Sequence, residues 1–498
     1  MGLSIFGNDV NRVSGVLVFF TTLLAFVVGW ITFDLTAEDE RLQMVIRALG
    51  VGAIVVIIFA VCEALGIRPI TQWLNSFRST VPFVDVYRVI STLDHPNSLA
   101  MYLELTLPFV IVWLVTTQCL RVRLMLMSVL VLGTLMMVLS LSRGGMVSFA
   151  VALLLFAIVA FRMGQRFQAL INIAMVAGLC IMLMVQSVLM PRLMVRLTSE
   201  GSNAAWYNAI YDAPAYIQAA PDETLSIAIK ITNTGLITWH TTGQQPVNLA
   251  YHMICPGGLS QQDFNIARMP ESKYLVTEGP RTGLPQVVPR GETVDLNVTM
   301  TAPSTAGTYW IAWDLIQESV TWFSDKGLQP AITVLEISGD KTALSCNGHI
   351  TRPDLHDQPS RLVLWETALR IIGDHSLVGV GTRNFPVYFQ KYTAITLATP
   401  PPHPHNLYLA LLVDYGVFSA GFIVMAALLL WRLWAAAKPA ETDSKQHWAI
   451  WFAIGIALMS FAFHNAVESF YYQPSIILTT CVIVGLLARF SITCHKQS

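Results

Sequence analysis

Long apolar stretches constrain this chain more than any other feature of its sequence. A helix that crosses the hydrocarbon core of a bilayer needs about 20 mostly apolar residues. Because backbone polar groups inside lipid must be hydrogen-bonded within their own segment, such stretches are expected to be helical. The sequence therefore predicts a mainly α-helical, polytopic membrane bundle of about nine transmembrane helices. The candidates are 13–33, 48–66, 98–117, 124–141, 146–161, 167–190, 407–434, 447–464 and 474–492.

Composition supports a membrane protein and excludes several other classes. Of 498 residues, 54% are hydrophobic and 12% are charged, against about 25% charged in a typical soluble domain. The formal net charge of −1 gives no basic field that would attract nucleic acid. The sequence has no glycine-rich phosphate loop and no Cys-x-x-Cys zinc pattern. We therefore predict no nucleic-acid partner, no metal and no cofactor.

Basic residues in the short loops predict the orientation of the bundle, because Lys and Arg accumulate on the cytoplasmic side. If the long polar segment between the sixth and seventh helices is external, the loops expected in the cytoplasm are all basic, and 465–473 has neither Lys nor Arg. This orientation places the C-terminus inside and the N-terminus outside. One external loop, 67–97, does not fit, because it holds Arg68, Arg78 and Arg88.

Between 200 and 345 the pattern changes to short alternating strands, such as 225–231 and 293–299, separated by Gly- and Pro-containing turns. This texture predicts an inserted extracytoplasmic β-sandwich that resembles immunoglobulin-like modules. Its tryptophans, among them Trp239, Trp310 and Trp313, could stack on sugar rings, but a place in the core is the commoner fate. Cys255 and Cys346 could form a disulfide in an oxidising compartment.

The expected organisation has four parts. Residues 1–199 hold the N-terminal transmembrane helices, 200–345 the sandwich, 346–406 an external loop with the site residues, and 407–498 the C-terminal transmembrane helices. In the third part, 360–372 reads as a helix too short and too charged to span. Its apolar residues recur at helical spacing, so it is expected to lie on the membrane surface. They are Leu362, Trp365, Leu369 and Ile372.

A polar loop, PPHPHN at 401–406, runs directly into the seventh apolar stretch and carries His403, His405 and Asn406. The unperturbed pKa of histidine lies near neutral pH, which suits it to taking a proton from a hydroxyl. On spacing alone, an equal alternative is that both histidines are ordinary polar residues at an interface. Because Pro404 separates them, His403 is expected to point away from His405.

Three arginines are predicted on the external face: Arg143, Arg361 and Arg383. Arg143 interrupts two apolar runs, where charge is costly, so an anion is expected to compensate it. Guanidinium groups bind phosphate oxygens bidentately, and the flanking Gly144 and Gly145 would let a bulky headgroup approach. The alternative is a tight loop in which Arg143 pairs with a carboxylate, either Glu104, Asp414 or Glu468.

Five motifs in order resemble the O-antigen ligase and polymerase superfamily, over residues 90–190 and 355–490. They are DHPNSLAMYL at 94–103, LSRGG at 141–145, Arg361 to Trp365, GVG at 379–381 with Phe385, and HNLYL at 405–409 with Gly416. The resemblance implies a glycosyltransferase of the bacterial inner membrane with a periplasmic active site. Such enzymes use a glycan carried on undecaprenyl pyrophosphate, without a nucleotide sugar or a required metal.

By the same resemblance, His405 would be the base acting on the acceptor hydroxyl, and the three arginines would hold the pyrophosphate. The expected supporting residues are Asn406, Glu468, Asp414 and His403. Two departures from the family pattern leave the acceptor open: only six helices precede the large loop, and the sandwich enlarges that loop.

The acceptor could be lipid A core in an O-antigen ligase, a growing glycan in an O-antigen or exopolysaccharide polymerase, or a protein hydroxyl in an O-oligosaccharyltransferase. A polysaccharide transporter with a binding module is an alternative of another class. A transporter would predict internal repeats and broken helices in matching halves, which the sequence does not show. The gathering of Arg and His on one face favours an enzyme.

Overall fold

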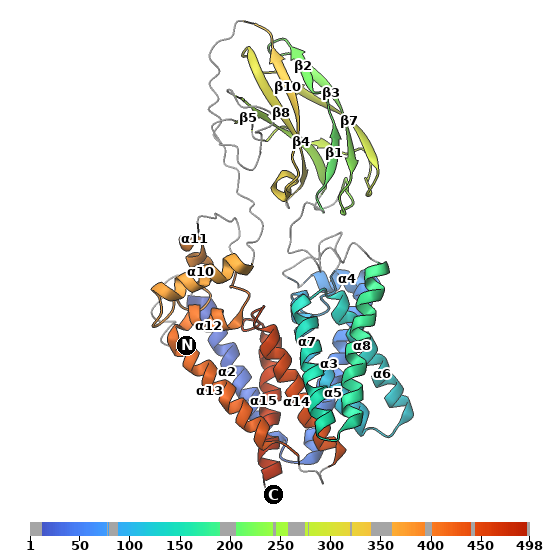
Figure 1. Ribbon diagram of the computed structural model, residues 1–498, viewed down its shortest axis with the longest axis vertical. Coiled ribbons are helices and arrows are strands. Elements are labelled where there is room, and N and C mark those ends of the chain that lie inside the picture. Colours follow the sequence, from blue (N-terminus) through green and yellow to red (C-terminus); the bar gives the residue numbers. More distant parts are fainter. Residues whose placement is uncertain are drawn as a thin grey trace. The chain divides into compact units, whose positions relative to one another are not determined.

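The computed structural model describes residues 12–76, 78, 88–189, 206–242, 246–256, 274–276, 278–318, 321–339, 361–393, 401–439 and 444–495. Contacts divide the chain into two compact units, one helical and one rich in strands (Figure 1). The helical unit comprises Met1–Leu197, Pro359–Ala394 and Pro400–Ser498. The sheet unit comprises Thr198–Gln358 and Ile395–Thr399.

Among the described residues, nine helices are long and apolar enough to cross a bilayer, which confirms the predicted number. Helix α5 lies at the centre, where it packs against α14, α3, α6 and α7, and most of its residues are buried. The nine are α2 (Arg12–Leu35), α3 (Asp39–Ala64), α5 (Pro96–Thr116), α6 (Leu120–Leu139), α7 (Arg143–Arg162), α8 (Arg166–Leu189), α13 (Val417–Ala436), α14 (Lys445–His464) and α15 (Pro474–His495).

The seventh apolar stretch is not one helix, so the expectation of a continuous helix over 407–434 is wrong. It breaks at Gly416 into α12 (Leu407–Tyr415) and α13. Gly416 has φ 66°, and a Cβ there would lie 2.3 Å from the carbonyl oxygen of Leu377. Only glycine fits that backbone and that close approach. Hydropathy could not reveal the break, because apolar residues continue on both sides of it.

Two of the three arginines in 67–97 that depart from the orientation pattern are held by protein groups. Arg78, which follows the short helix α4 (Arg68–Asn75), is buried with its Nη1 2.6 Å from Oε1 of Glu63. Arg88 donates to the carbonyl oxygen of Ser140 at 2.8 Å and to Oδ1 of Asn97 at 3.0 Å. These two side chains therefore have structural roles on the side predicted to be external.

The sheet unit contains two sheets, and the predicted strands 225–231 and 293–299 are both confirmed. They lie in β3 (Thr224–Asn233) and β7 (Thr293–Thr301), which pair antiparallel and bury alternate residues. With β1 (Ala209–Asp212) they form the smaller sheet. The larger sheet runs in the order β2 (Tyr216–Ala219), β10 (Ala331–Ile337), β8 (Gly307–Gln317), β4 (Val247–Ile254) and β5 (Tyr274–Val276), with β6 (Thr282–Gly283) on β4 and β9 (Thr321–Trp322) on β8.

The tryptophans of this unit lie in its core, as the commoner reading predicted. Trp239, Trp310, Trp313 and Trp322 are all buried, so none of the four offers an exposed face for stacking on a sugar. Cys255 is engaged in a disulfide, while its expected partner, Cys346, lies outside the described residues.

Two short helices of the helical unit precede the site loop: α10 (Arg361–Asp374) and α11 (Phe385–Tyr392). Helix α10 packs on α12 and α11, and its buried residues include Leu364, Ala368 and Ile371. Leu362 and Leu369, which belong to the predicted apolar stripe, are exposed on another face. A position of this stripe on a membrane surface stays a prediction.

Candidate active site

Loops distant in sequence meet at one end of the helical unit and bring several predicted site residues together. The backbone N–H of Leu407, which opens α12, donates to the carbonyl oxygens of Asn465 and Glu468 at 2.8 and 3.0 Å. Asn97, at the start of α5, donates from Nδ2 to Oε2 of Glu468 at 2.6 Å. The ends of α5, α12 and α14 therefore surround Glu468.

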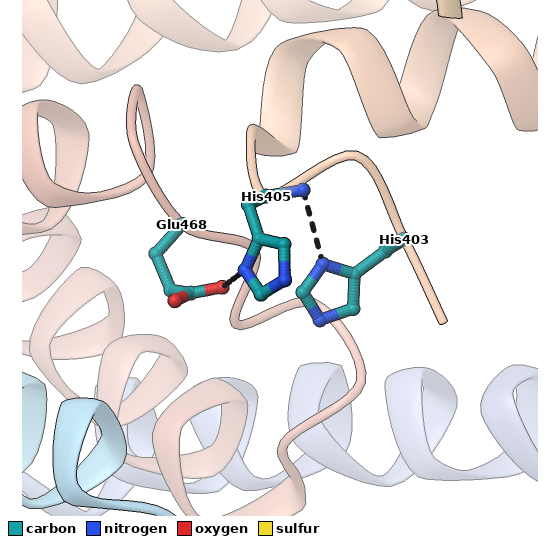
Figure 2. Close-up of side chains that lie close together, drawn as sticks. All are labelled: His403, His405 and Glu468. Atoms are coloured by element: carbon teal, nitrogen blue, oxygen red, sulfur yellow. Dashed lines mark hydrogen bonds and ion pairs between the residues drawn. The ribbon is translucent and has the colours of Figure 1, made fainter. Parts of the chain in front are cut away.

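His405 and Glu468 form a hydrogen-bonded pair at this end, with Nδ1 of His405 2.8 Å from Oε1 of Glu468 (Figure 2). The His405 side chain is 31% exposed, whereas that of Glu468 is 6% exposed. Besides Asn97, the backbone N–H of Ser469 donates to the carboxylate at 3.1 Å. These three donors fix the carboxylate, and the carboxylate in turn fixes the imidazole.

Glu468 is ionised at neutral pH. Burial by itself would raise the pKa of Glu468, but the hydrogen bond and charge of His405, with smaller contributions from His403 and His95, hold that pKa well below its usual range. The carboxylate therefore accepts the Nδ1–H of His405, and Nε2 is left to take up a proton. A base oriented by a third group is the arrangement that activates hydroxyl nucleophiles.

His403 does not point away from His405, so that expectation is wrong. The two ring centroids are 4.5 Å apart, and the backbone N–H of His405 donates to Nδ1 of His403 at 3.2 Å. His405 has φ 49°, a left-handed conformation that turns the chain back after Pro404. Spacing across a proline could not predict this turn. Burial lowers the pKa of His403 to about 4, so its ring is neutral.

Arg383 is linked to the histidines through Tyr472. The guanidinium carbon of Arg383 lies 5.0 Å from the centroid of the Tyr472 ring, a cation–π contact. The same ring stacks on His403 at 6.2 Å between centroids. The Tyr472 hydroxyl donates to Oδ2 of the buried Asp414 at 2.6 Å. Asp414 therefore holds the Tyr472 ring through its hydroxyl, and no hydrogen bond among the described residues joins Asp414 to His405.

The buried carboxyl of Asp414 should make the stability of the folded protein depend on pH. Burial raises the pKa of Asp414 to about 7, against smaller opposing effects of Tyr472 and Arg383. Because the folded state disfavours the ionised form, stability should fall as pH rises from about 4 through about 7. Asp414→Asn should lack this decline. The thermal stability of the variant minus that of the wild type should therefore be more favourable to the variant at pH 8 than at pH 5. Thermal unfolding in detergent at both values tests this; an equal difference at both contradicts it.

Arg143 opens α7 as an exposed residue, capped by Ser142. The interpretation that the glycines after it admit a headgroup is wrong. A Cβ on Gly144 would lie 2.9 Å from both Cδ2 of His464 and Cγ2 of Val467. Gly145 is equally tight, since its Cβ would lie 2.7 Å from that of Ala100. These glycines allow α7 to pack against α14 and α5.

A buried polar network joins α5, α7 and α14 beside these glycines. Nδ1 of His464 is 2.8 Å from Oε1 of Glu104, and its Nε2 is 3.4 Å from Oγ of Ser142. Ser148 donates to the other Glu104 oxygen at 3.0 Å. The order serine, histidine, glutamate resembles a nucleophilic triad. However, Ser142, His464 and Glu104 are each at most 2% exposed, so the network positions the Arg143 loop and cannot reach a substrate.

The remaining predicted residues have different places. Asn406 caps α12 by accepting from the backbone N–H of Leu409 at 3.0 Å, and its Nδ2 donates to the carbonyl oxygen of Ala466 at 2.8 Å. It therefore joins the histidine loop to the Glu468 loop. Arg361, at the start of α10, is half-buried, and no hydrogen bond or ion pair among the described residues joins it to His405 or Glu468.

Sequence reasoning missed Asn97 and Tyr472. Asn97 belongs to the DHPN motif, which carried the resemblance but received no role, whereas no local signal marked Tyr472. Backbone strain is a further sign of the site. Five non-glycine residues in the described part have positive φ, and all but Asp222 lie in loops of the helical unit's site end: Ser91, Leu141, Arg383 and His405.

The site also has the spacing of a metal centre. His403, His405 and Glu468 each offer a ligand atom, and these atoms lie within 4.8 Å of one another. In the present arrangement, Nδ1 of each ring is already used in a hydrogen bond. His405 and Glu468 can therefore act as an acid–base pair in this arrangement.

Residues 332–423 match the family model described as O-antigen ligase. The match runs from within β10 to within α13 and includes Arg361, Arg383, His403, His405 and Asp414, whereas Asn97, Arg143 and Glu468 lie outside it. A comparison with curated proteins gives no match. The match and the motifs that resemble this family agree, and the described part of the chain holds nine helices that are long and apolar enough to cross a membrane.

Proposed function

We propose that the protein transfers an oligosaccharide from undecaprenyl pyrophosphate to an acceptor hydroxyl. The observation that carries this proposal is the His405–Glu468 pair, with a partly exposed imidazole held at 2.8 Å from a buried carboxylate. His405 lies in the segment that matches a family of ligase- and polymerase-like glycosyltransferases.

In the proposed reaction, Nε2 of His405 removes the proton from the acceptor hydroxyl while that oxygen attacks the anomeric carbon. The bond from this carbon to the pyrophosphate oxygen breaks, and the pyrophosphate leaves with the electron pair. Glu468 stabilises the imidazolium that forms, and the proton then passes to solvent or to the departing carrier. Arg143, Arg361 and Arg383 are proposed to stabilise the charge on the pyrophosphate.

The site is proposed to face the periplasm, with the protein in the bacterial inner membrane. Loops at the end of the helical unit away from His405 are basic, as expected for a cytoplasmic face. In variants retaining one cysteine, an impermeant maleimide should label Ser376→Cys in intact spheroplasts and native Cys119 only after permeabilisation. The reverse pattern would show the opposite orientation. The basic residues are Arg121, Arg123, Arg162, Arg166, Lys438 and Lys445.

Purified protein with a synthetic polyprenyl-pyrophosphate oligosaccharide tests the function directly. Transfer to lipid A core would identify a ligase, chain extension a polymerase, and transfer to a protein Ser or Thr an O-oligosaccharyltransferase. Because the acid–base pair is complete without a metal, transfer should persist in EDTA. If no acceptor is glycosylated while the intact donor crosses the membrane in liposomes, the protein is a transporter and the proposal is wrong.

A further inference from the structure

His403 and His405 lie with their ring centroids 4.5 Å apart, and the two rings differ in hydrogen-bonding character. Nδ1 of His403 accepts a hydrogen bond from the backbone N–H of His405, so the neutral His403 ring carries its proton on Nε2. Nδ1–H of His405 donates to the Glu468 carboxylate, so in the neutral form of this ring the lone pair lies on Nε2. One ring therefore offers a donor and the other an acceptor.

The two nitrogens are available to a ligand. Both side chains are partly exposed, and within the described part of the chain neither Nε2 has a hydrogen-bond partner. The ring centroids are 4.5 Å apart at an interplanar angle of 65° (Figure 2). A single small group can therefore approach both rings at once.

We infer that the acceptor hydroxyl binds between the two imidazoles, its oxygen accepting from Nε2–H of His403 and its proton directed at Nε2 of His405. This inference rests on the proposed function and adds a positioning residue to it. The interaction holds the oxygen in place before proton transfer, which reduces the entropy lost on reaching the transition state.

The surroundings of His403 keep the ring in this donor state. The stack on Tyr472 fixes the ring plane, and Tyr472 is itself held by the buried Asp414. Burial lowers the pKa of His403 to about 4; the charges of His405, His95 and Arg383 act in the same direction, and only that of Glu468 opposes them. At neutral pH, His403 therefore offers one N–H as a hydrogen-bond donor and does not compete with His405 as a base.

The arrangement also selects the chemical class of acceptor. A hydroxyl both donates and accepts, and so satisfies both nitrogens. A protonated amine has no lone pair to accept from His403, which would leave its donor unpaired. We therefore expect hydroxyl acceptors to be used and the matching ammonium acceptors to be refused.

Two isosteric replacements separate this role from structural support. In His403→Asn, the side-chain oxygen can replace Nδ1 and accept the His405 N–H, but the Nε2 donor is lost. In His403→Gln, the side-chain amide nitrogen can replace Nε2 as donor. Acceptor KM, donor KM and kcat are measured for both variants and for His403→Ala, and bound lipid-linked donor shows that each variant is folded.

We expect His403→Gln to keep an acceptor KM near that of the wild type, while Asn and Ala raise it about tenfold, the loss of one hydrogen bond. Donor KM should stay unchanged in all three. The inference would be overturned if the acceptor KM of His403→Asn were as close to the wild-type value as that of His403→Gln, or closer. It would also be overturned if both variants raised the acceptor KM equally. Either result leaves wild-type transfer intact, so it is distinct from failure of the proposed function, in which the wild type itself transfers nothing.

Discussion

Replacing His405 with alanine should lower kcat by about 10² to 10⁴, the usual contribution of a general base, while binding of the lipid-linked donor persists. The variant removes the nitrogen that takes the hydroxyl proton but leaves the arginines in place. Single-turnover transfer by purified protein, with donor binding measured separately, tests this. If His405→Ala retains full transfer, another group must activate the hydroxyl, and Glu468 and Asp414 are the next candidates.

A matched variant examines the pair. Glu468→Gln keeps the size of the side chain but removes the charge that stabilises the imidazolium, so it should also lower kcat. Because both residues act as one unit, the double variant should be scarcely slower than His405→Ala alone. Independent, additive losses would show that the 2.8 Å contact has no part in the reaction.

Replacing Arg143 with lysine should raise the donor KM by about 10- to 100-fold, with a smaller change in kcat. Lysine keeps the positive charge but cannot form the two parallel hydrogen bonds that a guanidinium makes to phosphate oxygens, each worth about 1.5–3 kcal/mol. Steady-state kinetics at saturating acceptor measure the effect.

Arg121→Lys is the control for this variant, since Arg121 is an exposed residue at the opposite end of the helical unit, near the start of α6. It should leave the donor KM unchanged. An Arg143→Lys protein with wild-type donor KM and unaltered thermal stability would remove Arg143 from the donor site.

The features that were predictable from sequence depend on local patterns. Hydropathy finds the spanning helices, and alternation finds β3 and β7, because each pattern is contained within one segment. The loop of His405 was predictable because a polar cluster beside a long apolar run is conspicuous. In contrast, the bond from Asn97 to Glu468 joins residues 371 positions apart, and no pattern along the chain encodes it.

Other features depend on backbone geometry, which residue type specifies only weakly. The turn that brings His403 back to His405 needs a left-handed histidine, a conformation that sequence does not predict. The break at Gly416 needs contact with Leu377, which lies in another element. The role of Gly144 was misread for the same reason: the atoms that exclude a side chain there belong to α14 and the loop after it.

The contact of Gly144 with His464 and Val467 has a thermodynamic consequence. Because a Cβ at Gly144 would already lie 2.9 Å from both side chains, a shift of the Arg143 end of α7 toward α14 would displace the loop that carries Glu468. The positions of Arg143 and Glu468 are therefore expected to be coupled. If a bound donor shifts this coupled arrangement toward one that binds the acceptor more tightly, a bound acceptor must raise the affinity for the donor by the same factor. Such reciprocal affinity would retain the lipid-linked glycan most firmly when an acceptor is present to receive it.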